Sequence, residues 1–186
     1  MRAENKKELI FQAAVKVISE KGINNFSIQN VCDEAKISKG GLIYHFASKD
    51  VLIKSLHEYI IGYIEQLIID ERSIRATYTE SYLHACLLAS KSDETKAYMS
   101  LFNYDVNEEI KVLWEKFYEG VVEELSKELS NEWVTLVVLT TNGIFTKDNY
   151  YSEKELESAL NLLVNLIKTV HGPAYSFKAS RLTSKP

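Results

Sequence analysis

The sequence predicts an all-α fold in two domains, a small one over residues 1–47 and a larger one over residues 48–186. Two prolines and seven glycines are few for a fold built from many short strands and turns. Apolar residues recur at three- and four-residue spacing along most of the chain, as they do in amphipathic helices. With 46% hydrophobic residues among 186, the chain can bury a sizeable core in one or two domains.

The N-terminal part is predicted to contain one helix, two short helices and the start of a long one. Gly22 is placed to end the first helix. Ser27, Ser38 and Ser48 are each placed to cap the N-terminus of the next helix, because a serine side chain accepts a hydrogen bond from a free backbone N–H there. The helix after Ser38 is expected to end by Ala47, and the fourth helix, from about residue 48 to 70, connects the two domains.

The rest of the chain is predicted to be helical as well. The segment 133–145 is apolar around nearly its whole circumference, so we expect it to be buried on most sides. The sequence His171-Gly172-Pro173 is expected to end the last helix and to leave a loose polar tail. The expected helices cover residues 77–90, 94–103, 110–129, 133–145 and 152–170.

Charge is distributed unevenly along the chain. The whole chain has a net charge of −4, but residues 1–60 hold nine Lys/Arg and seven Asp/Glu, whereas the remainder holds thirteen and nineteen. Between Lys36 and Lys54 there are four lysines and one acidic residue. A basic segment on an acidic body is typical of a protein whose one end meets phosphate, although a solvated helix face would show the same pattern.

Two short capped helices joined by a tight turn, with a longer helix before them, are typical of a helix-turn-helix motif. The second short helix of that motif lies in the major groove of DNA. Gly40 and Gly41 fall in its first turn, where the missing side chains would let the backbone approach DNA closely. The side chains of this segment that could bind phosphate or reach a base are Lys39, Tyr44, His45 and Lys49.

Three stretches carry a resemblance to a known family: "AAVKVISEKG", "FSIQNVCDEAKISKGGLIYHF" and "SKDVL". From about Lys7 to Leu56 the chain resembles the DNA-binding domain of the TetR family of bacterial transcriptional regulators. Two positions depart from the family pattern. Lys36 stands at the turn where glycine is usual, so backbone strain or an altered turn is expected there. Ile43 replaces a tyrosine that contacts phosphate in many members, and we move that role to Tyr44.

The resemblance implies an N-terminal helix-turn-helix DNA-binding domain of three helices that binds double-stranded operator DNA. Ser27 and Ser38 would face phosphate at helix starts, and Lys49 would clamp the DNA backbone. Gln29 would lie on a base edge, where its amide can pair bidentately with adenine. The implied DNA-binding residues are Ser27, Gln29, Ser38, Lys39, Gly40, Gly41, Tyr44, His45 and Lys49.

The resemblance also implies a C-terminal helical domain for ligand binding and dimerisation. Family members form homodimers through their last two helices, and "TTNGIF" is similar to a segment seen there. A small, mostly apolar or aromatic effector would bind inside the domain and release a repressor from DNA. The side chains expected to line its pocket are Tyr78, Tyr82, Cys86, Tyr98, Phe102, Trp114, Phe117 and Tyr118.

Two alternatives remain open from the sequence. The first is a DNA-binding regulator that answers to a partner protein and has no ligand pocket. The second is an all-helical metal-binding enzyme, for which Glu80 and His84 at helical spacing are the candidate ligands, but the sequence lacks the usual metal, phosphate-loop and hydrolase motifs. We therefore expect no enzyme activity, cofactor, metal site or membrane span. Cys32 and Cys86 are expected to be buried thiols of a cytoplasmic protein.

Overall fold

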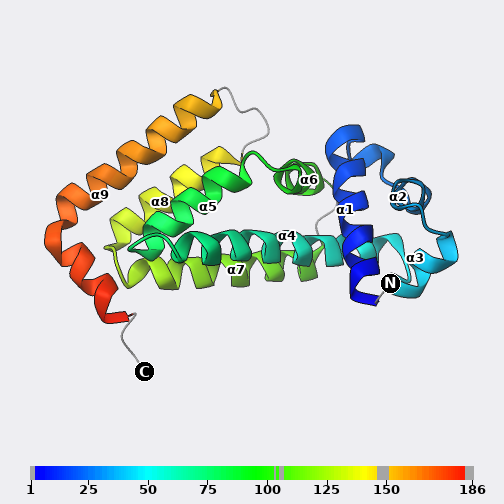
Figure 1. Cartoon of the computed structure of the whole chain (residues 1–186), viewed down its shortest axis with the longest axis horizontal. Coiled ribbons are helices and arrows are strands. Elements are labelled where there is room, and N and C mark those ends of the chain that lie inside the picture. The colour runs from blue at the N-terminus through cyan, green and yellow to red at the C-terminus, as the bar shows by residue number, and fades with distance from the viewer. Residues whose placement is uncertain (1–2, 103, 105–106, 146–150, 183–186) are drawn as a thin grey trace. The chain divides into compact units, whose positions relative to one another are not determined.

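Helices dominate the part of the chain that this computed structural model describes, which comprises residues 3–102, 104, 107–145 and 151–182 (Figure 1). No strand occurs among these residues, and the predicted all-α fold is confirmed. The elements are α1 (Ala3–Lys21), the 3-10 turn η1 (Ile23–Asn25), α2 (Ile28–Ala35), α3 (Lys39–His45), α4 (Lys49–Arg72), α5 (Tyr78–Ala89), α6 (Asp93–Phe102), α7 (Glu108–Ser126), α8 (Asn131–Ile144) and α9 (Glu153–Leu182).

The first of two compact units comprises Met1–Tyr63 and Ser92–Trp114. Within it, α1 packs against α2, η1 and α6, and α2 packs against α3. The Phe11 ring of α1 stacks on the Tyr59 ring of α4, with 4.8 Å between the centroids. The buried apolar side chains that fill this unit include Ile10, Ala14, Ile18, Phe26, Val31, Leu42, Phe46, Leu52 and Leu56.

Serine caps begin the three helices after α1, as the sequence predicts. The Ser27 hydroxyl oxygen accepts a hydrogen bond from the Asn30 amide at 3.1 Å. The Ser38 oxygen accepts from the Gly41 amide at 3.1 Å, and the Ser48 oxygen accepts from the Val51 amide at 3.2 Å. Each bond satisfies one of the backbone donors that a helix leaves free at its N-terminus, which is why these helices begin where they do.

The second unit comprises Ile64–Lys91 and Glu115–Pro186, and in it α5 packs against α8 and α9. Each unit is made of two separate segments of the chain, so no single boundary in the sequence divides them. Helix α6 and the first turns of α7 belong to the same unit as the short N-terminal helices. The domain boundary at residue 47 stays a prediction. The buried side chains of this unit include Tyr82, Leu83, Cys86, Val121, Leu125, Val137, Leu160, Leu163 and Ile167.

The expected end of the last helix was wrong, and the expected burial of 133–145 on most sides is not met within the single chain. Helix α9 continues through Gly172 and Pro173 to Leu182, where a stop and a loose tail were expected. Proline removes one helical hydrogen bond and can bend a helix without ending it, and Figure 1 shows α9 changing direction along its length. Helix α8 buries one face only, because Leu136 and Leu139 on its other face are exposed in the single chain.

Among the described residues, no helix combines the length and the apolarity needed to cross a membrane.

Candidate nucleic-acid interface and effector region

Helix α3 is anchored by one apolar side chain within it and by another directly after it, and most of its other residues are exposed. Leu42 and Phe46 are buried, whereas Lys39, Ile43 and Tyr44 are exposed. Tyr44 is 85% exposed to solvent. Its ring lies edge-on to the ring of His45, with 5.1 Å between the ring centroids. An aromatic side chain this exposed contributes little to the core, so the outer face of α3 is available for contact with another molecule.

The surroundings of the two glycines of α3 differ in whether they leave room for a side chain. A Cβ added to Gly41 would lie 3.2 Å from the Ser38 hydroxyl oxygen that caps the helix, so the cap itself favours glycine there. A Cβ added to Gly40 would meet nothing within 4 Å. Packing within the described residues therefore does not require glycine at position 40, and the open backbone on this exposed turn suits a close external contact.

Gln29 and Ser27 lie at the start of α2. Gln29 is exposed, and its amide nitrogen donates to the Asp33 carboxylate at 2.7 Å, one turn further along α2. This bond leaves the amide oxygen of Gln29 as an acceptor. The amide nitrogen has two N–H donors, so one N–H of Gln29 and its amide oxygen remain for bidentate pairing with adenine while the other N–H is bonded to Asp33.

Lys49, at the first position of α4, is held by aromatic side chains. Its ammonium donates to the Tyr104 hydroxyl at 3.3 Å. The same nitrogen lies 5.5 Å from the centre of the Phe26 ring and 5.0 Å from that of the Tyr104 ring. Sequence reasoning missed Tyr104, because it stands 55 residues from Lys49 and no motif links the two.

The lysines near the short helices differ in their partners. Lys16 pairs with Glu34 at 2.7 Å, and Lys54 pairs with Glu109 at 2.6 Å. The ion pairs among the described residues include none for Lys36 or Lys39, both of which are exposed. These two cations flank the start of α3, where a phosphate group could approach them.

The structure divides the eight predicted effector residues between the two units. Tyr98, Phe102 and Trp114 belong to the first unit, where the Tyr98 and Trp114 rings lie 4.4 Å apart and Phe102 is exposed. The Trp114 indole N–H donates to Nδ1 of buried His57 at 3.1 Å. The residues that fall in the second unit are Tyr78, Tyr82, Cys86, Phe117 and Tyr118.

In the second unit, three of these side chains share one face of α5. The rings of Tyr78 and Tyr82 are nearly parallel, with 6.3 Å between the centroids. The buried Tyr82 hydroxyl lies 3.2 Å from the Thr141 hydroxyl of α8. Cys86 follows one turn later, and burial raises the pKa of its thiol to about 12, so it stays protonated at neutral pH.

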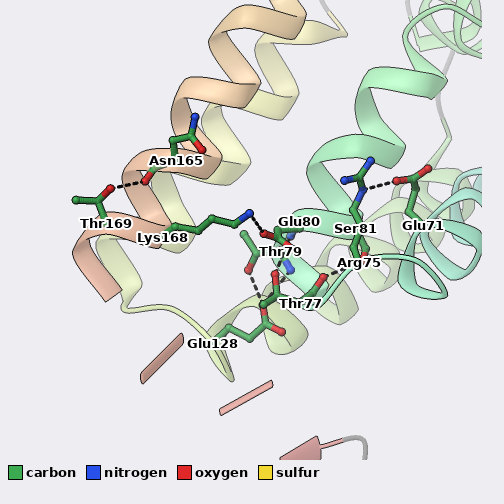
Figure 2. Close-up of polar contacts among 10 residues, drawn as sticks. All are labelled: Glu71, Arg75, Thr77, Thr79, Glu80, Ser81, Glu128, Asn165, Lys168 and Thr169. Atoms are coloured by element: carbon green, nitrogen blue, oxygen red, sulfur yellow. Dashed lines mark hydrogen bonds and ion pairs between the residues drawn. The ribbon is translucent and has the colours of Figure 1, made fainter. Parts of the chain in front are cut away.

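Figure 2 shows the polar contacts that fix the start of α5. The buried carboxylate of Glu128 accepts from the Thr79 amide at 2.9 Å and from the Thr79 hydroxyl at 2.7 Å. It also accepts from the Tyr78 amide at 2.8 Å. Lys168 reaches from α9 to the Glu80 carboxylate at 2.5 Å. These contacts tie α5 to α9 and to the turn after α7, and so hold the tyrosines of α5 in place.

The polar contacts also bear on the metal-binding alternative. Glu80, one of its two candidate ligands, is paired with Lys168. Within the described ranges, no group of three or more His, Cys, Asp or Glu side chains could hold a metal ion. The chemistry of this region is that of a helix-positioning network.

A hollow of about 450 Å³ lies between α8 and the start of α9. None of the eight predicted effector residues lines it. Its walls are largely apolar, and several of the wall residues are exposed in the single chain. The lining residues are Leu139, Thr140, Gly143, Ile144, Tyr151, Glu155, Leu156, Ala159 and Leu160.

Residues 10–56 match the model of a protein family described as bacterial regulatory proteins, tetR family. Over 56 residues, the chain is 39% identical to the uncharacterised HTH-type transcriptional regulator YuxN of Bacillus subtilis (strain 168), a stretch that is 30% of this chain and 19% of that protein. The chain spans about a fifth to a third of the length of the curated relatives it matches. The matches confirm the resemblance carried by the N-terminal sequence.

Solved structures resemble most of the chain in fold. A member of the TetR family from Streptomyces coelicolor A3 has a TM-score of 0.67 at 18% identity, with 85% of this chain and 97% of that one covered. The multidrug binding protein EbrR complexed with malachite green has a TM-score of 0.61 at 18% identity, with 84% and 96% covered. At such identities the likeness shows a shared all-α fold.

Proposed function

We propose that the chain is a transcriptional regulator of the TetR family of bacterial regulatory proteins and that it acts as a cytoplasmic dimeric repressor. It binds double-stranded operator DNA and is released by a small, mostly apolar or aromatic molecule. The observation that carries the proposal is the outer face of α3, where exposed Lys39, Gly40 and Tyr44 follow a serine-capped helix start.

The DNA contact would be made by the starts of α2, α3 and α4. Backbone N–H groups at helix starts favour phosphate oxygens, and the cations Lys36 and Lys39 stand beside the start of α3. Tyr44 and His45 would bind phosphate or reach a base further along α3, and Gln29 would read a base edge from α2. Ser27, Ser38, Gly41 and Lys49 complete the proposed interface.

The dimer contact would be made by α8 and α9. Among the described side chains of these helices, five large apolar ones are exposed in the single chain, although each helix has other apolar side chains buried. One of them, Leu139, also lines the hollow between the two helices. A second copy of the chain would cover both across a two-fold axis. The exposed side chains are Leu136, Leu139, Leu162, Leu166 and Val170.

The effector would bind among the aromatic side chains of the C-terminal helices. Tyr78, Tyr82 and Cys86 on α5, with Phe117 and Tyr118 on α7, offer apolar walls with polar tips. Tyr98, Phe102 and Trp114 belong to the other unit and are not part of this proposed site. EbrR in complex with malachite green supports an aromatic organic molecule as the class to test first.

The test measures DNA binding of substituted proteins. A duplex is first selected by the parent protein from a random library, and affinities are then titrated across salt concentrations. Tyr44→Ala and Lys39→Ala should weaken binding to all duplexes, and loss of the lysine should reduce the salt slope by about one unit. Gln29→Ala should instead cost roughly 1–3 kcal/mol of discrimination between bases. If all three variants bind the selected duplex like the parent, the proposed interface is wrong.

A further inference from the structure

The ammonium of Lys49 is fixed between two aromatic rings from distant parts of the chain. Phe26 forms one side; its ring is buried in the core, so its position is set by the packing of α1 and α2. Tyr104 forms the other side and accepts a hydrogen bond from the same nitrogen at 3.3 Å. A ring face attracts a cation, so these contacts stabilise one position of a side chain that is otherwise flexible.

Tyr104 is itself held by α6. Its backbone amide donates to the carbonyl of Leu101 at 2.9 Å, and Leu101 is buried. Helix α6 packs against α1 and η1 within the same compact unit. The position of the Tyr104 ring therefore follows the packing of α6 on the N-terminal helices.

The place where Lys49 is held adjoins the start of α2. Phe26 directly precedes Ser27, which caps that helix. An ammonium group has three N–H donors, and the bond to Tyr104 uses one of them. The remaining donors, the Ser27 hydroxyl and the free N–H groups of α2 all suit a single phosphate.

We propose that Tyr104 is a positioning residue for DNA binding: it holds the Lys49 ammonium against Phe26, beside the start of α2, where Lys49 and Ser27 receive one DNA phosphate. This inference rests on the proposed function. A lysine fixed in place loses less conformational freedom when it binds phosphate, so the aromatic pair strengthens the contact. Because Tyr104 follows α6, the packing of α6 sets the strength of one DNA contact.

The test is a cycle of substitutions at positions 49 and 104, measured as the dissociation constant for the selected duplex over a range of salt. Tyr104→Ala should weaken binding about 3- to 10-fold, in line with the strength of such ring contacts. Tyr104→Phe keeps the ring and loses the hydroxyl, so it should weaken binding less. Lys49→Met should weaken binding and reduce the salt slope by about one unit. In the Lys49→Met background, Tyr104→Ala should have no further effect.

The outcomes separate this inference from the proposed function. If the parent protein selects no duplex, the proposed function fails. If the parent binds DNA and Tyr104→Ala binds equally well or more tightly, the positioning role is wrong. The positioning role is also wrong if Tyr104→Ala weakens binding by the same factor in the parent and in the Lys49→Met protein, because a general structural defect would act in both. If the Tyr104→Ala protein does not fold, Tyr104→Phe is combined with Lys49→Met instead. If these two substitutions weaken DNA binding additively, the positioning role of Tyr104 is wrong.

Discussion

Lys36 adopts a left-handed backbone conformation between α2 and α3, with φ 54 and ψ 43. The Ile37 amide donates to the carbonyl of Cys32 at 3.0 Å, which is the six-to-one bond of a Schellman motif. That motif requires a left-handed residue before Ile37, and glycine adopts this conformation without the clash that a Cβ brings. The strain expected at Lys36 from the sequence is therefore present, and the turn keeps its ordinary geometry.

We expect Lys36→Gly to raise the free energy of unfolding by up to roughly 1 kcal/mol, because relief of the left-handed strain exceeds the entropy that glycine adds to the unfolded chain. Urea unfolding followed by circular dichroism measures the change. Lys36→Ala is the matched control, since it removes the same charge and keeps the Cβ. Equal stability of the glycine and alanine variants would show that the turn stores no strain.

His57 is a buried titratable group whose state depends on pH. It is 1% exposed, and its Nδ1 accepts the Trp114 indole N–H, which requires a neutral ring. Burial lowers the pKa of His57 to about 4. In the unfolded chain an ordinary histidine has a pKa near 6.5. The pKa of His57 is lower in the folded state than in the unfolded chain. Its neutral ring therefore contributes its full stabilisation of the folded state above about pH 6.5, and this contribution is lost as the pH falls toward 4.

Between pH 6.5 and 4, His57 alone should lower the free energy of unfolding by about 3 kcal/mol. His57→Gln keeps a hydrogen-bond acceptor and cannot take up a proton in this range. We expect the variant to be less stable than the parent at pH 7 and to lose less stability between pH 6.5 and 4. Denaturant unfolding at several pH values tests this, and parallel pH profiles for the two proteins would contradict it.

At the level of single helices, the starts were easier to predict than the ends. A capping serine acts on an amide three residues later, so Ser27, Ser38 and Ser48 can be identified from adjacent sequence alone. The end of α9 was missed because Pro173 ends a helix only if nothing else holds the chain helical. The sequence did not show which face of α8 is buried, because the helix is also apolar on a face that the single chain leaves exposed.

Helix α9 presents one apolar side chain outward and its neighbour inward. Leu162 is 60% exposed, whereas Leu163 is 7% exposed and packs in the core. The structure therefore refines the expected dimer surface: the available side chains are Leu162 and Leu166, while Leu163 and Ile167 are buried within the chain.

If the proposed dimer forms through this face, Leu162→Lys should shift the protein to monomer in sedimentation velocity and leave its helical spectrum intact. Leu163→Lys is the matched variant, and it should destabilise the fold by several kcal/mol because it buries an unpaired charge. Loss of the dimer should also weaken operator binding, since two half-sites would no longer be bound together. A Leu162→Lys protein that remains dimeric would place the interface elsewhere.

Over the whole molecule, the contacts that could not be predicted are those between residues far apart in sequence. Lys49 meets Tyr104 across 55 residues, Trp114 meets His57 across 57, and Thr79 meets Glu128 across 49. Periodicity identifies which face of a helix is apolar, but it does not say which other helix covers that face. The grouping of α6 with the N-terminal helices follows from such contacts alone, and the proposed role of Tyr104 depends on it.

Control by an effector requires that a change in one unit reaches the other. Helix α4 is continuous from Lys49 to Arg72, and its residues up to Tyr63 belong to the first unit and those from Ile64 to the second. A ligand among Tyr78, Tyr82 and Phe117 would stabilise one arrangement of the second unit. Helices α4 and α7 have residues in both units, so they are the elements through which such an arrangement would affect the proposed DNA contacts.

Linkage makes this coupling reciprocal, so operator DNA must weaken effector binding by the same factor by which the effector weakens operator binding. A factor of about 5 to 150 is typical of such couplings. The measurement is calorimetry of an aromatic compound found by screening, titrated into the free protein and into the protein saturated with the selected duplex. Tyr82→Ala should lower the affinity for the compound and leave DNA binding of the unliganded protein unchanged. Equal affinities of the compound with and without DNA would show that it is not an inducer, and control through a shared α4 would then be wrong.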